Sequence, residues 1–178
     1  MAYQFMKLLK WIRFTWDLTK LPVSDVALPH HYAIAPAGAE DEQGLRKVFS
    51  SSFLLDPSWS FAIGEVMQTI QSRLDVALAS DKFMCLALRH GTRIIGAAVL
   101  ALDENTEDQL APGPSILMEY RNRGLGTCLL QSSLLRLRES GLTRASGSAL
   151  NYAPVAKFLY PKFGGVVARA ESVALLAA

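Results

Sequence analysis

The 178-residue chain lacks the residue patterns that mark disulfide-rich proteins and metal sites. It has two cysteines, Cys85 and Cys128, and they form no C-x-x-C pair, so we expect two buried free thiols rather than a disulfide framework. The three histidines are His30, His31 and His90, and none has the spacing of a metal ligand. The sequence therefore predicts no metal, and its cysteine usage fits a protein of a reducing cytoplasm.

The chain also lacks a strong charge of either sign. Its formal net charge is +2, which is too mild to predict a dedicated nucleic-acid binder. Hydrophobic residues make up 51% of the chain and charged residues only 19%. This composition suffices for one well-buried domain and excludes disorder of the whole chain.

Residues 1 to 21 are predicted to form an amphipathic helix of their own. One helical face carries the apolar residues Phe5, Leu8, Leu9, Ile12 and Trp16. Basic residues recur along the segment, so we expect it neither to span a membrane nor to be cleaved as a signal peptide. Three contacts are possible for this helix: with the protein's own surface, with a second copy in a homodimer, or with a membrane surface. Residues 22 to 30 are predicted to be a linker, because Pro22 ends the helix.

Residues 31 to 178 are predicted to form one α/β domain. Apolar periodicity predicts, in order, a strand at 31–35, helices at 40–53 and 61–79, strands at 83–89 and 93–102, a strand end at 116–118, a helix, a strand at 143–150, a helix, and closing strands at 166–170 and 172–176. The acidic residues 103–108 form a loop. They are either a solvated turn or a cluster that draws a cationic amine toward a site.

A glycine-rich turn between the strand end Ile116-Leu117-Met118 and the next helix predicts an anion site. The first N–H groups of a helix have no partner within it and can bind a phosphate together. Gly124 and Gly126 remove the side chains that would hold a ligand away. The loop is not a Walker loop, because no lysine follows Gly126, and Leu129 stands where a dinucleotide loop needs a small residue.

Two segments resemble the GCN5-related N-acetyltransferase (GNAT) family. Arg121-x-x-Gly124-x-Gly126 is similar to the R/Q-x-x-G-x-G/A loop with which that family holds the pyrophosphate of acetyl-coenzyme A. The segment 151–164 is similar to the family's N-x-x-x-A-x-x-L/F-Y-x-K-x-G-F segment and matches it at Asn151, Ala156, Tyr160, Lys162 and Gly164. Pro161 is expected to end the helix near Tyr160.

The resemblance implies an acetyl-CoA-dependent N-acetyltransferase that moves an acetyl group to a primary amine by direct attack. It implies a mixed, mostly antiparallel central sheet flanked by helices, here with an extra N-terminal helix. The acceptor would be a small-molecule or protein amine. The coenzyme-binding residues would be Leu117, Met118, Arg121, Asn122, Arg123, Gly124, Leu125, Gly126, Thr127, Asn151 and Tyr160. The alternative is a non-catalytic acyl-CoA-binding or sensing domain of the same fold.

The resemblance also assigns roles within the reaction. A Leu117 or Met118 N–H would lie near the thioester oxygen, and Tyr160 would protonate the leaving thiolate, unless it is a packing tyrosine. Asn151 would bind the pantetheine arm, cap a helix, or do both. Glu119 is expected to be a solvated side chain, so the base stays unassigned. Residues of the segment between the first two helices are candidates for the acceptor site, namely Phe53, Leu54, Trp59 and Phe61.

Overall fold

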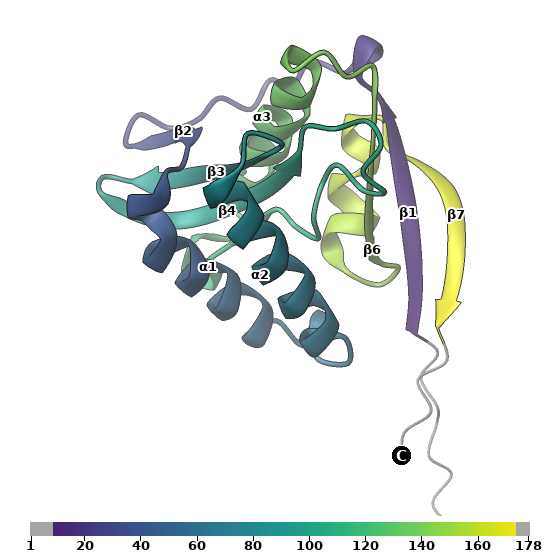
Figure 1. Cartoon of the computed structure of the whole chain (residues 1–178), viewed down its shortest axis with the longest axis horizontal. Coiled ribbons are helices and arrows are strands. Elements are labelled where there is room, and N and C mark those ends of the chain that lie inside the picture. The colour runs from purple at the N-terminus through teal and green to yellow at the C-terminus, as the bar shows by residue number, and fades with distance from the viewer. Residues whose placement is uncertain (1–8, 174–178) are drawn as a thin grey trace, which may run out of the picture.

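The structure, a computed structural model, describes residues 9–173 and arranges them as two sheets and three longer helices (Figure 1). The strands are β1 (Leu9–Asp17), β2 (Tyr32–Pro36), β3 (Phe83–His90), β4 (Arg93–Ala101), β5 (Ser115–Ile116), β6 (Arg144–Leu150) and β7 (Val166–Val173). The helices are α1 (Glu42–Leu54), α2 (Ile63–Ala79) and α3 (Leu125–Glu139). Shorter helical turns are η1 (Leu18–Lys20), η2 (Ala39–Asp41), η3 (Pro57–Trp59), η4 (Met118–Tyr120), the π-helical η5 (Val155–Leu159) and η6 (Pro161–Phe163).

The two sheets are antiparallel and meet at one point. One has the strand order β2-β3-β4-β5, and the other has the order β6-β1-β7. Leu110 joins them, because it bridges Leu100 of β4 and Gly147 of β6. β5 and β6 are therefore edge strands of separate sheets, and the sheets diverge between them. From residue 31 to residue 163 the predicted order of elements is confirmed, and so is the mostly antiparallel arrangement of the strands.

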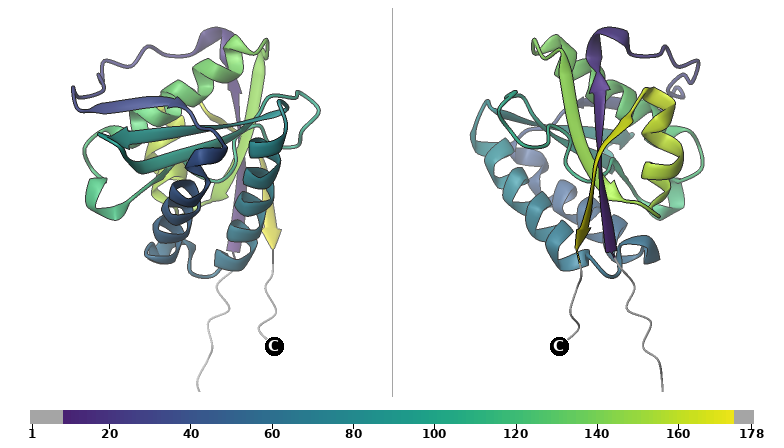
Figure 2. Two further views of the ribbon diagram at one scale, coloured as in Figure 1. Left: turned by 60° about the vertical axis from the view of Figure 1, so that its left-hand side comes forward. Right: turned by 90° about the vertical axis from the view of Figure 1, so that its right-hand side faces the viewer.

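Helices cover both faces of the four-stranded sheet. α1 and α2 lie on one face and α3 lies on the other (Figure 2). The buried side chains of α1 recur at the period of a helix and are Leu45, Val48, Phe49, Ser52 and Phe53. This apolar stripe packs against β4 and brings the C-terminal end of α1 toward β5.

The prediction of an N-terminal helix is wrong for residues 9–17, which form β1. This strand is the central strand of its sheet, pairing with β6 from Trp11 to Asp17 and with β7 on its other edge. From Ile12 to Leu18 apolar and polar residues alternate, which is the pattern of a strand with one buried face. The aromatic and β-branched composition of residues 11–16 was the signal for a strand. Residues 1–8 of the predicted helix lie outside the described residues.

The side chains of β1 are part of the main core. Phe14 and Trp16 are 3% and 1% exposed, and they pack against Tyr160 and each other. Residues 11–17 therefore belong to the sheet and not to a helix, and contact of the N-terminal segment with a second copy or a membrane stays a prediction. The segment 22–30 does connect two elements without regular structure, as expected, but both belong to one fold.

Three further features concern the rest of the chain. The two closing strands predicted at 166–170 and 172–176 are one strand up to residue 173, and residues 174–178 lie outside the described part. Cys85 and Cys128 are buried free thiols, as predicted. Within residues 9–173 no helix is long and apolar enough to cross a membrane, and no group of acidic, histidine and cysteine side chains is arranged to hold a metal ion.

Candidate active site

The gap between the sheets leaves one edge of β5 without a strand partner. The Leu117 N–H donates to the carbonyl oxygen of Ile95 in β4 at 2.9 Å. Because neighbouring residues of a strand direct their backbone groups to opposite sides, the N–H and C=O of Ile116 face the gap. The Ile116 carbonyl accepts a hydrogen bond from Arg121 Nε there, at 3.0 Å. The backbone N–H that faces the gap is thus that of Ile116, and the expected role of the Leu117 N–H is excluded by its bond to Ile95.

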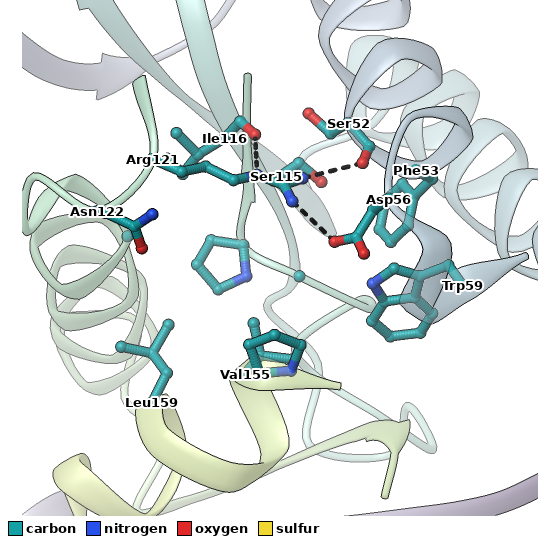
Figure 3. A pocket seen from close by; sticks show the side chains of 14 residues that line it. Ser52, Phe53, Asp56, Trp59, Ser115, Ile116, Arg121, Asn122, Val155 and Leu159 are labelled. Carbon is teal, nitrogen blue, oxygen red and sulfur yellow. Dashed lines mark hydrogen bonds and ion pairs between the residues drawn. The ribbon is translucent and has the colours of Figure 1, made fainter. Parts of the chain in front are cut away.

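A pocket of about 350 Å³ opens at this gap (Figure 3). The last turn of α1 contributes Ser52 and Phe53 to one side of it, and the α1–α2 connection contributes Asp56 and Trp59. The opposite side comes from the loop before α3, from α3 and from η5, with Asn122, Gly126, Pro154, Val155 and Leu159. Gly113, Pro114, Ser115, Ile116 and Arg121 lie between the two sides. The pocket therefore joins the two faces of the four-stranded sheet.

Gly126, in the first turn of α3, lines one end of the pocket, and the start of a helix is an environment that suits a phosphate. Gly124 is the N-cap residue and has a φ of 78°, a conformation that favours glycine. The first helical hydrogen bond runs from the Cys128 N–H to the Gly124 carbonyl at 3.1 Å, so the N–H groups of Leu125, Gly126 and Thr127 precede the first bonded turn. The side chain of Leu125 is buried, and its contribution to a ligand would come from its backbone.

Gly126 keeps this end of the pocket open. A Cβ atom placed on Gly126 would have Ile116 Cγ1 and Leu159 Cδ2 as its nearest neighbours, both at 3.9 Å. These are ordinary van der Waals distances, so the protein itself has room for a side chain here. That side chain would occupy the space in front of the helix start. Gly126 therefore fits the expected role of a position that lets a ligand approach the backbone.

Arg121 does not direct its side chain at the start of α3. Its Nη1 donates to Asp56 Oδ2 at 2.8 Å, and its Nη2 donates to the Ser52 carbonyl at 2.9 Å. Together with the bond to Ile116, these contacts tie β5 to the α1–α2 connection (Figure 3). Asp56 lies 65 residues before Arg121, and no local pattern could have revealed the pair.

Arg123 also has partners away from the helix start. Its Nη2 donates to the Glu119 carbonyl at 2.9 Å, and its guanidinium lies 5.4 Å from the centre of the Tyr120 ring. The Glu119 side chain is exposed and pairs with Arg93 at 3.0 Å, so the expectation of a solvated residue is confirmed. At the predicted anion site the donors would therefore be backbone N–H groups rather than the two arginines.

Tyr160 lies in the core and does not line the pocket. Its side chain is fully buried between Phe14 and Trp16, with ring centres 5.2 and 5.1 Å away, and its hydroxyl donates to the carbonyl of Gly113. The helix ends before Pro161, as predicted, which turns Tyr160 inward. The geometry is that of a packing tyrosine, and the predicted role as the acid has no support from this position.

The other predicted residues divide between the pocket and the surface. Phe53 and Trp59 line the pocket and make an edge-to-face contact at 5.1 Å, whereas Leu54 and Phe61 are exposed and lie outside the lining. Asn151 is exposed, lies outside the lining and is not the N-cap of η5. Met118 is 45% exposed at the start of η4, beside the end of β5.

The acidic loop 103–108 is not part of the pocket. Arg13 of β1 binds Asp108 at 3.0 Å and Glu107 at 2.6 Å, and Arg73 of α2 donates to the Asp108 carbonyl at 2.7 Å. The Arg13 guanidinium lowers the pKa of Glu107. These two carboxylates therefore join β1 to the rest of the fold, which gives the loop a structural role.

The buried thiol and phenol predict a loss of stability at alkaline pH. Burial raises the pKa of Cys85 from 9.0 to about 12, and burial also raises the pKa of Tyr160 above its ordinary value of 10.0. Above pH 9 the unfolded chain therefore binds fewer protons than the folded chain, and the free energy of unfolding falls. The slope should reach about 1.4 kcal/mol per pH unit for each group. Urea unfolding at a series of alkaline pH values measures it. Cys85→Ala and Tyr160→Phe should each flatten the slope, and a flat profile in the wild type would contradict this account.

Comparison with known proteins identifies the fold of the chain. No protein-family model matches the sequence, and none of the curated proteins matches it. Solved structures do match. A GCN5-related N-acetyltransferase from Sphaerobacter thermophilus has a TM-score of 0.62 at 15% identity, over 93% of this chain and 50% of that one. A GCN5-related N-acetyltransferase from Kribbella flavida has a TM-score of 0.56 at 12% identity, over 89% and 54%. The chain has the GCN5-related N-acetyltransferase fold.

The chain is also similar in structure to a conserved protein of unknown function from Staphylococcus epidermidis, with a TM-score of 0.60 at 14% identity over 92% of this chain and 60% of that one. The chain spans 50 to 60% of the length of these three structures. The structural similarity establishes the fold. At identities of 12 to 15% it does not establish the activity, which has to be argued from the site.

Proposed function

We propose that the protein is an N-acetyltransferase that moves the acetyl group of acetyl-CoA to a primary amine by direct attack. The observation that carries the proposal is the pocket at the divergence of the sheets, which is lined by Gly126 in the first turn of α3. A coenzyme whose phosphates lie at Leu125, Gly126 and Thr127 would extend its pantetheine arm along the free edge of β5. Asn122 and Gly126 line that path, and Gly124 permits the turn that opens it.

The pocket supplies three of the elements that such a reaction needs. The Ile116 N–H faces the gap and would donate to the thioester oxygen as negative charge develops on it. Pro154, Val155 and Leu159 give the pantetheine side an apolar wall that excludes water. The open side between the α1–α2 connection and β5 leaves a route for the amine, so that amine and thioester meet without an enzyme-bound intermediate. The base that takes the proton of the amine is not assigned to a side chain.

The test is acetyl-CoA consumption in the presence and absence of primary amines. Purified protein is given acetyl-CoA with a panel of amines, free thiol is measured with a chromogenic disulfide, and products are identified by their mass. We expect thiol release that depends on the amine and an acetylated product. Acetyl-CoA binding without release on any amine would favour the alternative, a binding or sensing domain of the same fold.

Tyr160→Phe adds a check on how the proton is handled. Because the hydroxyl is bonded to the Gly113 carbonyl in the core, its removal should lower the free energy of unfolding by about 1 to 3 kcal/mol. Turnover per folded molecule should stay within about twofold of the wild type. A loss of turnover of about a hundredfold or more, with stability unchanged, would restore Tyr160 as the acid.

A further inference from the structure

The proposed reaction needs a group that accepts a proton, and the pocket contains one carboxylate. The nitrogen of a primary amine must lose a proton as it bonds to the thioester carbon. Of residues 9–173, Asp56 is the only carboxylate that lines the pocket. Its side chain is 11% exposed, so the carboxylate is shielded from bulk water without being sealed off. In Figure 3 this carboxylate is turned toward the pocket, where a substrate amine can reach it.

Two fixed partners orient the Asp56 carboxylate. Its Oδ1 atom accepts from the Ser58 N–H at 2.9 Å, and its Oδ2 atom accepts from Arg121 Nη1 at 2.8 Å. A carboxylate oxygen has two lone pairs, so each oxygen keeps one that can take a proton. The guanidinium of Arg121 stays protonated in a protein, so it fixes the direction of the carboxylate and takes no part in the proton transfer.

Arg121 also relates the carboxylate to the strand edge at which the thioester would lie. The guanidinium that donates to Asp56 through Nη1 donates to the Ile116 carbonyl through Nε, at 3.0 Å. One guanidinium group therefore separates the Asp56 carboxylate from the free edge of β5. An amine nitrogen between that edge and Asp56 could contact the thioester carbon and the carboxylate together, which is the geometry that a general base needs.

Aromatic side chains border the carboxylate on the side of the α1–α2 connection. Phe53 and Trp59 line the same part of the pocket, and their rings make an edge-to-face contact at 5.1 Å. The face of an aromatic ring attracts a cation, so this wall would favour an ammonium group beside Asp56. Arg121 is the only basic residue in the lining among residues 9–173, and its three hydrogen bonds hold it in place.

We propose that Asp56 is the general base of the acetyl transfer. This assignment rests on the proposed function, which leaves the base open. The amine nitrogen attacks the thioester carbon, the C–N bond forms, and the C–S bond breaks with its electron pair on sulfur. Carboxylates are weaker bases than amines, but the nitrogen becomes more acidic as it bonds to the carbon, and it then gives one proton to Asp56. Asp56 releases this proton to water, and the departing thiolate takes a proton from water.

The test removes the carboxylate and then supplies one from solution. Asp56→Ala leaves space beside Arg121 that formate can occupy. The substrate is whichever of ethanolamine, cadaverine, glycine and glucosamine the wild type acetylates fastest, at saturating acetyl-CoA. We expect kcat per folded molecule to fall about a hundredfold in Asp56→Ala, and formate to raise it at least about fivefold. Chloride at the same concentration also pairs with a guanidinium but is too weak a base to take the proton, so it should not raise kcat.

Two results of this experiment would overturn the assignment. One is a loss of kcat smaller than about threefold in Asp56→Ala. The other is recovery with chloride equal to recovery with formate, because the carboxylate would then serve only to balance the charge of Arg121. If Asp56→Ala does not fold, Asp56→Asn takes its place, since its amide oxygen can still accept from Arg121, and it should show the same loss of kcat.

Asp41→Ala is the matched control. The side chain of Asp41 is also 11% exposed, and it likewise binds one arginine, Arg89 at 2.6 Å, and one backbone N–H, that of Gly38 at 3.1 Å. Asp41 lies outside the pocket. Its replacement should lower thermal stability about as much as that of Asp56 but leave kcat per folded molecule within about twofold of the wild type, with or without formate. Equal losses of kcat in the two variants would overturn the role of Asp56.

A second measurement detects the contact between amine and carboxylate without acetyl-CoA. The protein is labelled with ¹³C at the carboxyl groups of its aspartates, and Asp56→Asn and Asp41→Asn identify the two signals. The same amine, at concentrations that saturate turnover, should shift the Asp56 signal and leave the Asp41 signal in place. An Asp56 signal that does not respond to the amine would overturn the assignment.

The two proposals fail in different ways. If the wild type acetylates an amine and Asp56→Ala is equally active, the base is wrong and the N-acetyltransferase stands. If the wild type consumes no acetyl-CoA with any of the four amines, the N-acetyltransferase is wrong, and the assignment of the base falls with it.

Discussion

Replacing Trp16 by alanine is expected to lower the free energy of unfolding by about 3 to 5 kcal/mol. Trp16 is 1% exposed in β1, and its ring makes an edge-to-face contact with Tyr160 at 5.1 Å. Its truncation leaves a cavity between the two sheets and removes an aromatic contact from the core. Urea unfolding followed by circular dichroism measures the change.

Val23→Ala is the control for this experiment, because Val23 lies in the same N-terminal part of the chain but is 90% exposed. It should change stability by less than about 0.5 kcal/mol. If Trp16→Ala were as mild as Val23→Ala, the N-terminal segment would not be the central strand of the sheet, and its assignment as β1 would be wrong.

Replacing Arg121 by alanine should lower the free energy of unfolding by about 2 to 4 kcal/mol and weaken acetyl-CoA binding as well. The change removes three hydrogen bonds and leaves the carboxylate of Asp56, whose side chain is 11% exposed, without its cation. It also releases the α1–α2 connection from β5. Thermal unfolding and coenzyme titration on the same samples measure the two effects.

Two further variants separate charge from geometry at Arg121. Arg121→Lys keeps the charge but cannot reproduce three bonds in fixed directions, so it should recover less than half of the lost stability. Arg93→Ala is the control, because Arg93 forms an exposed ion pair with Glu119 and should change stability by at most about 1 kcal/mol. An Arg121→Ala protein as stable as Arg93→Ala would show that the contact with Asp56 is not structural.

Local patterns predicted most of the fold from residue 31 onward. The 3.6-residue period of α1 and the short turn at His90 to Thr92 are properties of neighbouring residues, and the structure confirms both elements. The alternation of apolar and polar residues from Ile12 to Leu18 was a local signal for β1 that the prediction missed, and its partners β6 and β7 lie more than 120 residues away in the sequence. Periodicity cannot report such pairing.

The site shows the same division between local and distant information. The glycine turn before α3 was predictable, because the turn and the helix start are formed by consecutive residues. The partners of Arg121 and the inward position of Tyr160 depend on segments that meet only after folding.

The most direct measurement of the central claim is calorimetric titration of acetyl-CoA into the wild type and Gly126→Val. The structure has room for the first side-chain atom at Gly126, so the variant should fold, and circular dichroism and thermal unfolding verify this. The added side chain occupies the space in front of the α3 start, and we expect the dissociation constant to rise at least tenfold, or about 1.4 kcal/mol. Gly64→Val is the control, because nothing lies within 4 Å of a Cβ atom there. Equal affinity for acetyl-CoA in wild type and folded Gly126→Val, or no binding by either, would contradict the proposed coenzyme site.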